Sequence, residues 1–321
     1  MEPSVSGRVP RARRRRRTVV VLLLLVLAAL VVVVPRIREG GGPPPHPVHF
    51  LVGAALPDNA DPSPMERAAG VHLGIHRTFW DRSGLDASVE VARQDLARGR
   101  VPLLSYKTGD WGGASRGADD DWVRSAARRL SALGGTVMVA LDHEPEGDGD
   151  IRLWTRLQQR LAPFFDLPHL EFGVVLTGYH QFFGDPEYSL PSLWPTGAPI
   201  DFLGLDIYQS YGSVSKQTGA LRTRWTNLDH TYFSRVREFC ASKGIFWGLA
   251  ETGITDRAWA ERPEAPRWFA STASAIAREG GTFFAYFDSR QNSGANTWPL
   301  SGSKRAAFLD LLRSPPTSSA G

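Results

Sequence analysis

The chain has 321 residues, 42% hydrophobic and 22% charged, which is the balance of a globular protein and excludes a wholly disordered one. Its formal net charge of +4 comes from the N-terminus, where seven arginines lie within the first 17 residues; the remainder is slightly acidic, so we expect no nucleic-acid partner. The single cysteine, Cys240, excludes an intrachain disulfide.

The first feature in chain order is the arginine-rich segment 1–17, followed by an apolar segment at 18–35. Within it, Val19–Val34 contains no charged or polar residue. As a helix this run would span about 24 Å, short for a membrane helix but long for a signal-peptide core, and no small-residue cleavage site follows it. We therefore expect a single-pass signal anchor in the cell membrane, with segment 1–17 in the cytoplasm and the rest outside. Secretion after cleavage is the alternative, and a nuclear-type basic patch is the weakest interpretation.

The remainder of the chain divides into three parts. Residues 36–47 are rich in glycine and proline and form a predicted linker. Residues 48–313 form the predicted catalytic domain, and residues 314–321 a disordered tail. We expect this protein to be a monomer.

Within the domain, short apolar runs alternate with segments of helical periodicity. Near-continuous apolar runs are typical of strands buried on both faces, as in parallel sheets. Strands are predicted at 48–56, 70–79, 101–108, 135–144, 171–180, 200–209, 244–253 and 281–289. Helices are predicted at 88–99, 119–135, 150–164, 227–244 and 265–281, and none is clear in the proline-rich connections after the first and fifth strands. This order predicts an α/β fold, a (β/α)8 TIM barrel; an open doubly wound sheet is the alternative, without a glycine-rich phosphate loop.

In such a barrel the active site lies at the C-terminal ends of the strands. Polar and aromatic residues that end the apolar runs should therefore converge there. Besides two glutamates discussed below, we predict substrate-binding roles for His76, Trp80, Trp111, His143, Tyr179, Asp206, Tyr208, Asp288 and Trp298. Arg77, Lys107, Asp110 and His180 also lie at strand ends, without an assigned role.

The two glutamates are Glu144, which ends the fourth strand, and Glu251, which ends the seventh. Glutamates three strands apart can face each other across a barrel mouth. Retaining glycosidases need two carboxyl groups about 5–5.5 Å apart, one to protonate the leaving oxygen and one to attack the anomeric carbon. The pair is therefore predicted to be catalytic.

Four motifs in this order resemble glycoside hydrolase clan A, and most closely family 26, whose best-known members are β-mannanases. They are "HE" at 143–144, "DFLGLDIY" at 201–208, "GLAETG" at 248–253 and "FAYFDS…NTWPL" from 284. The resemblance implies that Glu144 is the general acid/base, that Glu251 is the nucleophile and that Tyr208 lies beside it. Pro145 makes the fourth-strand motif closer to the Asn-Glu-Pro of other clan A families. The substrate therefore stays open among β-mannan, β-glucan and an exopolysaccharide.

Two other function classes remain as alternatives. A non-catalytic carbohydrate-binding barrel would keep the tryptophans without needing both glutamates. A metal-dependent polysaccharide deacetylase would use the scattered histidines and aspartates. His72 and His76 have the spacing of a metal pair on one strand face, but no third ligand is apparent, and "DHEPEGDGD" lacks the spacing of an EF-hand loop. No metal or cofactor is predicted.

Overall fold

The computed structural model of the chain describes residues 49–215, 218–290 and 297–317. The predicted cytoplasmic segment, membrane anchor and linker lie outside these residues. Within the described part of the chain, no helix has the length and apolar character needed to cross a membrane. The anchor therefore stays a prediction from the sequence.

The described residues fold into a closed barrel of eight parallel strands that follow the order of the chain. The strands are β1 (Leu51–Ala55), β2 (Ile75–Asp81), β3 (Val101–Lys107), β4 (Val137–Leu141), β5 (Leu170–Leu176), β6 (Phe202–Asp206), β7 (Phe246–Thr252) and β8 (Phe283–Phe287). β8 pairs with β1 and closes the sheet. The (β/α)8 barrel predicted from the sequence is confirmed, and the open sheet is excluded.

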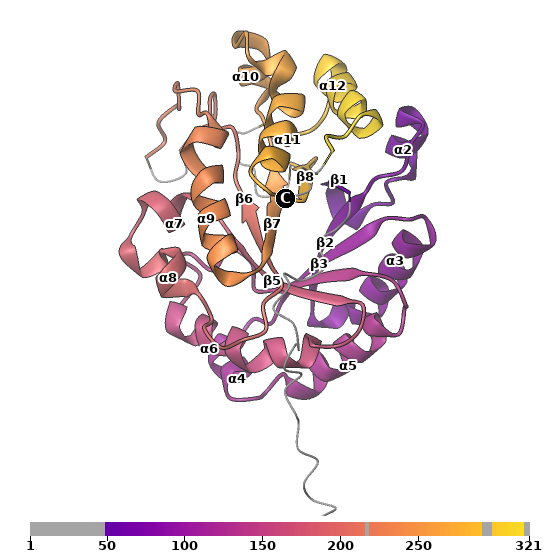
Figure 1. Cartoon of the computed structure of the whole chain (residues 1–321), viewed down its shortest axis with the longest axis vertical. Coiled ribbons are helices and arrows are strands. Elements are labelled where there is room, and N and C mark those ends of the chain that lie inside the picture. Colours follow the sequence, from indigo (N-terminus) through magenta and orange to yellow (C-terminus); the bar gives the residue numbers. More distant parts are fainter. Residues whose placement is uncertain (1–48, 216–217, 291–296, 318–321) are drawn as a thin grey trace, which may run out of the picture. The chain divides into compact units, whose positions relative to one another are not determined.

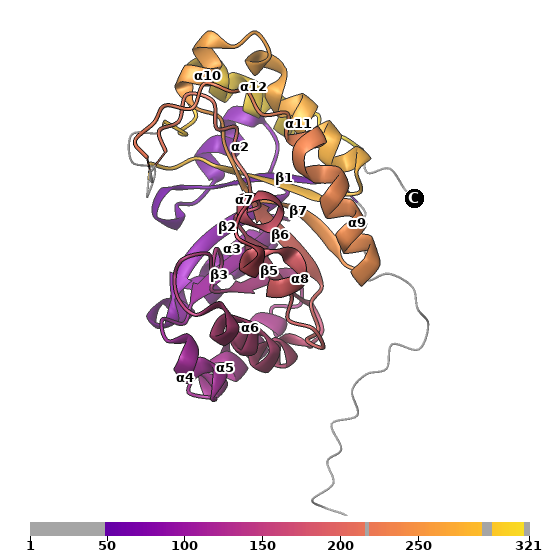
Figure 2. The same ribbon diagram turned by 90° about the vertical axis from the view of Figure 1, so that its left-hand side faces the viewer.

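Helices surround the strands (Figure 1). They are α2 (Ser63–Ala69), α3 (Leu85–Ala97), α4 (Trp111–Ser115), α5 (Asp120–Ser131), α6 (Ile151–Leu161), α7 (Tyr179–Phe183), α8 (Leu190–Leu193), α9 (Ser234–Lys243), α10 (Asp256–Glu261), α11 (Trp268–Arg278) and α12 (Gly302–Arg313). Figures 1 and 2 both place α4, α5 and α6 on one side of the barrel and α10, α11 and α12 on the opposite side. A π-helical turn, Asp229–Phe233, leads into α9.

Both faces of the sheet are buried, which is why the strands appear in the sequence as continuous apolar runs. The barrel interior holds a cluster of its own, separate from the core between strands and helices. Phe202, Phe246 and Phe283 pack together in it, with ring centroids 5.6–6.4 Å apart. Gly173 leaves room for them, because a Cβ there would lie 2.5 Å from the Phe202 ring. The interior is thus filled by apolar side chains, and polar groups gather at the C-terminal ends of the strands.

Short helices follow β1 and β5, where the sequence predicted none. α2 begins at Ser63-Pro64, and α8 begins at Leu190-Pro191. Proline is tolerated in the first turn of a helix, where its missing N–H is not needed. Helices of seven and four residues are too short to give a clear 3.6-residue periodicity.

Candidate active site

Glu144 follows β4 in a backbone conformation that few residues adopt. Asp142 and Glu144 both have positive φ angles, 46° and 49°. Such a conformation costs on the order of 1 kcal/mol or more and persists only where surrounding contacts hold it. Here the Asp142 carboxylate accepts hydrogen bonds from the Thr108 N–H at 3.0 Å and the Thr108 hydroxyl at 2.7 Å. The Glu144 N–H donates to the Val175 carbonyl at 2.9 Å, so β5 holds the glutamate backbone in place.

Glu251 reaches the barrel mouth through an irregularity in β7. Ala250 faces the interior and Leu249 faces the helices, so strict alternation would turn Glu251 outward. The register shifts at this point, because Leu205 lies opposite Leu249 whereas Asp206 lies opposite Glu251. The extra residue in β7 acts as a β-bulge, which re-aims a side chain. Glu251 consequently lies beside Asp206 at the mouth.

Arg77, on β2, links these two carboxylates. Its guanidinium is fully buried and binds Asp206 through two hydrogen bonds of 2.7 and 3.2 Å. The same group lies 3.3 Å from Glu251 Oε1. It also lies over the Phe79 ring, 4.9 Å from its centroid. Sequence reasoning assigned Arg77 no role, although it stands at a strand end and next to the predicted His76.

Tyr208 and Trp298 complete the surroundings of Glu251. The Tyr208 hydroxyl donates to Glu251 Oε2 at 2.5 Å, and burial together with Glu251 raises its pKa well above the ordinary value, so it keeps its proton. The Trp298 ring packs on Tyr208 at 4.7 Å and is only 7% exposed. Its carbonyl accepts from the Tyr286 hydroxyl at 2.6 Å and from Lys304 Nζ at 3.2 Å. Trp298 therefore braces Tyr208 and offers little surface for stacking on a sugar.

Glu144 has a different electrostatic environment. Burial, with the negative charge of Glu251 as the second cause, raises its pKa to about 7. Arg77 acts in the opposite direction, but it forms its ion pairs with Asp206 and Glu251. One guanidinium thus serves several carboxyl groups. Burial raises the pKa of Asp206 well above its ordinary value although Arg77 is bound to it, and Glu144, which has no ion pair among the described residues, has a pKa close to neutrality.

His143 is held neutral beside Glu144. Burial, assisted by the positive charges of Arg77 and Lys107, lowers its pKa well below the ordinary value. Lys107 Nζ donates to the His143 carbonyl at 2.6 Å, and the imidazole packs against the Phe79 ring at 5.5 Å. A neutral imidazole adds no positive charge that would favour ionisation of Glu144.

Trp111, at the start of α4, lines a cavity of about 610 Å³ next to Asp142. The tryptophan is partly exposed, and its side chain is near enough to Asp142 to lower the pKa of that carboxyl group. Lys107 and Asp148 form an ion pair of 3.2 Å on another wall. A partly exposed indole beside polar groups suits the predicted stacking on a sugar ring.

His76 and Trp80 are not brought to this site, and their predicted substrate-binding roles do not fit their positions. The His76 side chain points to the helix layer, where Nδ1 lies 2.9 Å from Asp95 on α3. Trp80 lies on the same side of β2 and donates from Nε1 to the Thr78 hydroxyl at 2.8 Å. Because side chains alternate along a strand, β2 sends Arg77 to the interior and His76 to the helices.

Among the described residues, neither Tyr179 nor Asp288 has a hydrogen bond, ion pair or ring contact with the two glutamates or Arg77. Tyr179 is 55% exposed on α7, and its ring packs on those of His180 and Phe183. Asp288 follows β8 and accepts a hydrogen bond of 2.7 Å from the Leu300 N–H, so it fixes the loop that carries Trp298. The structure thus gives Tyr179 a place at the surface and Asp288 a role in holding a loop.

The described residues, 49–215, 218–290 and 297–317, contain no group of three histidine, cysteine, aspartate or glutamate side chains that could hold a metal ion. His72 Nδ1 lies 3.2 Å from Glu66, whereas His76 bonds to Asp95, so the two histidines do not form a pair.

Comparison with known proteins gives a fold-level relationship. No protein-family model and no curated sequence matches the chain. Its structure is similar to that of an endo-β-1,4-mannanase of glycoside hydrolase family 26 from Cellulomonas fimi, with a TM-score of 0.57 and 15% identity over 85% of this chain and 73% of that one. GH26C from Muricauda sp. gives a TM-score of 0.56 and 14% identity over 85% and 88%. Cel5A from Thermotoga maritima, solved with mannotriose, gives 0.58 and 13% over 82% and 97%.

These solved structures are glycoside hydrolases, and two of them belong to family 26. At such identities the likeness concerns the fold. The resemblance to family 26 and clan A expected from the motifs is therefore confirmed at the level of the fold, and the chain has the barrel architecture of clan A glycoside hydrolases.

Proposed function

We propose that the protein is a retaining glycoside hydrolase that cleaves internal linkages of a β-linked polysaccharide, such as β-mannan, β-glucan or an exopolysaccharide. The observation that carries the proposal is the unequal environment of two glutamates at one barrel mouth. Glu144 has a pKa near 7 and can deliver a proton, whereas Glu251 is in contact with a guanidinium and a tyrosine hydroxyl. The mechanism requires one protonated carboxyl group for acid catalysis and one carboxylate for nucleophilic attack.

In the first step, the Glu144 carboxyl group donates its proton to the glycosidic oxygen as the bond from that oxygen to the anomeric carbon breaks. A Glu251 carboxylate oxygen forms a new bond to the same carbon, giving a glycosyl ester and a released sugar chain with a free hydroxyl. Tyr208 and Arg77 hold Glu251 in place during the attack. Positioning of this kind lowers the entropic part of the barrier.

In the second step, Glu144 acts as a base. Ester formation removes the negative charge of Glu251, which is one cause of the raised pKa of Glu144. The pKa of Glu144 therefore falls in the intermediate, and the carboxylate can take a proton from water. The water oxygen attacks the anomeric carbon, the ester bond breaks, and Glu251 leaves as a carboxylate. Two displacements at one carbon retain its configuration.

The topology expected from the N-terminal sequence places this activity outside the cell. Under that proposal the apolar segment 18–35 anchors the protein in the cell membrane as a single span, and the short linker keeps the barrel near the surface. A polymer in or near the cell envelope would then be its substrate. Release after cleavage remains the alternative.

A hydrolysis screen of the full chain tests the proposal. Mannan, galactomannan, mixed-linkage β-glucan, cellulose, xylan and bacterial exopolysaccharides would be offered to the wild type and to the Glu251→Ala variant. We expect new reducing ends from one polymer, absent with the variant, and an initial product of β configuration by proton NMR. An initial α product would contradict retention.

Two other outcomes would favour the alternative classes. Binding of a polymer without cleavage by the wild type would indicate a carbohydrate-binding barrel. Release of acetate that stops when a chelator is added would indicate a metal-dependent deacetylase. A retaining glycosidase of the proposed kind keeps its activity with the chelator present.

A further inference from the structure

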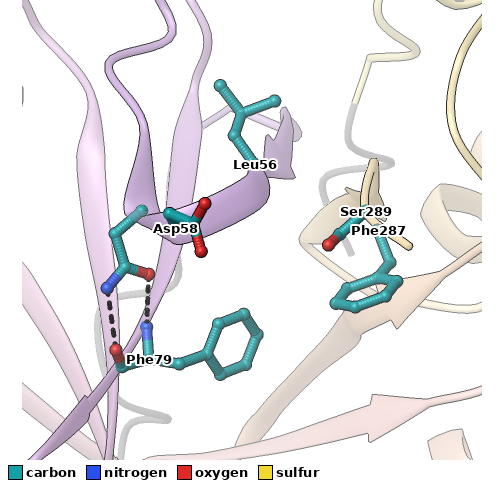
Figure 3. Close-up of a pocket in the computed structure, with 6 residues that line it drawn as sticks. Leu56, Asp58, Phe79, Phe287 and Ser289 are labelled. Atoms are coloured by element: carbon teal, nitrogen blue, oxygen red, sulfur yellow. Dashed lines mark hydrogen bonds between the residues drawn. The ribbon is translucent and has the colours of Figure 1, made fainter. Parts of the chain in front are cut away.

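A cavity of about 220 Å³ lies between the loop after β1 and the ends of β2 and β8. Six residues line it: Leu56, Asp58, Asn59, Phe79, Phe287 and Ser289. Figure 3 shows the Asp58 carboxylate above the Phe79 ring, facing the space that Phe287 and Ser289 border from the other side. The cavity has room for one sugar ring, and the mechanism above gives it no role.

The two phenylalanines that line the cavity also contact residues next to the two proposed catalytic glutamates. Phe79 lies 5.5 Å from the ring of His143, which precedes Glu144. Phe287 lies 6.2 Å from the ring of Tyr208, which donates to Glu251. The two phenylalanine rings lie 6.4 Å apart, edge to face. A sugar unit in this cavity would therefore be a near neighbour of the unit that is cleaved.

Asp58 is presented to the cavity by a fixed turn. Asp58 and Asn59 have φ angles of 53° and 56°, in the left-handed region that aspartate and asparagine tolerate better than most residues. The Asn59 amide oxygen accepts from the Phe79 N–H at 2.9 Å, and its amide nitrogen donates to the Phe79 carbonyl at 2.8 Å. This double hydrogen bond ties the turn to β2 and occupies the Asn59 side chain.

Asp58 itself has no hydrogen bond or ion pair with another residue in the described part of the chain, and it is exposed. It is also the one charged side chain among the six that line the cavity. A carboxylate offers two oxygens that accept hydrogen bonds and no donor. It can therefore bind the hydroxyl groups of a sugar, and it repels a second carboxylate.

We propose that Asp58 is a specificity-determining residue of a sugar subsite in this cavity, accepting hydrogen bonds from a neutral sugar unit and rejecting a uronic acid. The proposal rests on the function proposed above, because it names the class of polymer that this site takes. The charged groups near the two glutamates also favour a neutral sugar unit over a uronate. Arg77, the guanidinium nearest to the glutamates, is buried and already bound to Asp206, so it offers no partner to a uronate.

The test uses oligosaccharides that differ at one group. β-1,4-Mannopentaose and the β-1,4-linked pentamer of mannuronate differ only in the hydroxymethyl or carboxylate at C6 of each unit; cellopentaose and its C6-oxidised form give a second pair. Binding is measured by calorimetry in full-length Glu251→Gln protein, which keeps the ligands intact. Asp58→Asn is added to this background. Asp166→Asn is the matched control, because it removes the same charge from an exposed residue at the other end of the barrel, just before β5.

We expect the neutral pentamer of at least one pair to bind at least about tenfold more tightly than its anionic counterpart at low salt. Asp58→Asn should reduce this ratio by about tenfold, and Asp166→Asn should leave it unchanged. High salt should also reduce the ratio, since it screens the repulsion. Asp58→Ala should in addition weaken binding of the neutral pentamer, because both acceptors are lost.

Three results would overturn the inference: a ratio unchanged by Asp58→Asn, tighter binding of the anionic pentamers, or no binding of any of the four ligands. The hydrolysis screen separates these failures from a failure of the proposed function. Hydrolysis with an unchanged ratio would reject Asp58 alone. Selective binding through Asp58 without hydrolysis would reject the glycosidase and leave the subsite standing.

Discussion

The ends of β4 and β7 each carry one glutamate, yet the two carboxyl groups have different surroundings. At β4, two left-handed residues hold Glu144 in a half-buried position without an ion pair among the described residues, and its pKa rises to about 7. At β7, a bulge brings Glu251 to a guanidinium and a tyrosine hydroxyl. The comparison shows that the surroundings of a carboxyl group, rather than its residue type, decide whether it can act as an acid or as a nucleophile.

Removal of the β7 carboxylate should have the largest effect. Glu251→Ala should lower turnover of the polymer by about four orders of magnitude, because no covalent intermediate can form. Azide should restore turnover as a replacement nucleophile and give a product of inverted configuration, which NMR would detect. If azide gave a product of retained configuration instead, the roles of the two glutamates would be exchanged.

Removal of the β4 carboxyl group should have a smaller effect that depends on the leaving group. Glu144→Ala should slow hydrolysis of the polymer by about 10²–10⁴-fold, the usual contribution of a general acid. The first step should hardly slow for aryl glycosides with acidic phenols, since these leave without a proton. Burst kinetics with such a substrate would show the intermediate accumulating, and an equal loss on both substrate types would argue against Glu144 as the acid.

The contribution of the buried Arg77 guanidinium, which pairs with Glu251 and Asp206, can be tested by measuring the stability of the fold. Arg77→Met should destabilise the fold by about 3–5 kcal/mol in urea unfolding, because Asp206 and Glu251 would lose their buried partner. Arg77→Lys keeps the charge but not the paired hydrogen bonds, and should lose less stability than Arg77→Met. Equal stability of Arg77→Met and wild type would contradict the importance of this ion pair.

The smallest effect is expected from the groups that orient Glu251. Tyr208→Phe removes one hydrogen bond to a charged group and should lower kcat by about tenfold or somewhat more with little change in KM. Gly253→Ala offers a related test, because its Cβ would lie 2.9 Å from Tyr208 and 3.1 Å from Trp298. A loss confined to KM in both variants would place Tyr208 in substrate binding instead.

The barrel could be predicted from the sequence, and so could the place of the two glutamates at the ends of the fourth and seventh strands. Eight apolar runs gave the strands, and "HE" and "GLAETG" gave Glu144 and Glu251. The direction of the side chains could not be predicted in the same way. Both faces of a barrel strand are buried, so the apolar pattern does not tell which residues face inward. This is why His76 was favoured over Arg77, although the structure turns Arg77 to the interior.

Local irregularities were also hidden in the sequence. The bulge that re-aims Glu251 breaks the alternation of β7, and no residue in "FWGLAET" marks its position. Asp58 and Asn59 have positive φ angles although neither is a glycine, the residue that usually signals such a turn. Only "PDN", with residue types common in turns, could have drawn attention to the cavity that Asp58 lines.

The proposed division of roles between the two glutamates can be tested by measuring the pKa of Glu144 in the wild type and in Glu251→Gln. It can be followed by carbon-13 NMR of labelled glutamate side chains, with Glu144→Gln to assign the signal. We expect a pKa near 7 in the wild type, so that the protonated acid is present below about pH 7 and is lost as the pH rises through that value. In Glu251→Gln the pKa should fall, because the repelling charge is gone. A wild-type pKa near the ordinary value of 4.5, unchanged by Glu251→Gln, would contradict the role of Glu144 as a general acid whose pKa is raised by Glu251.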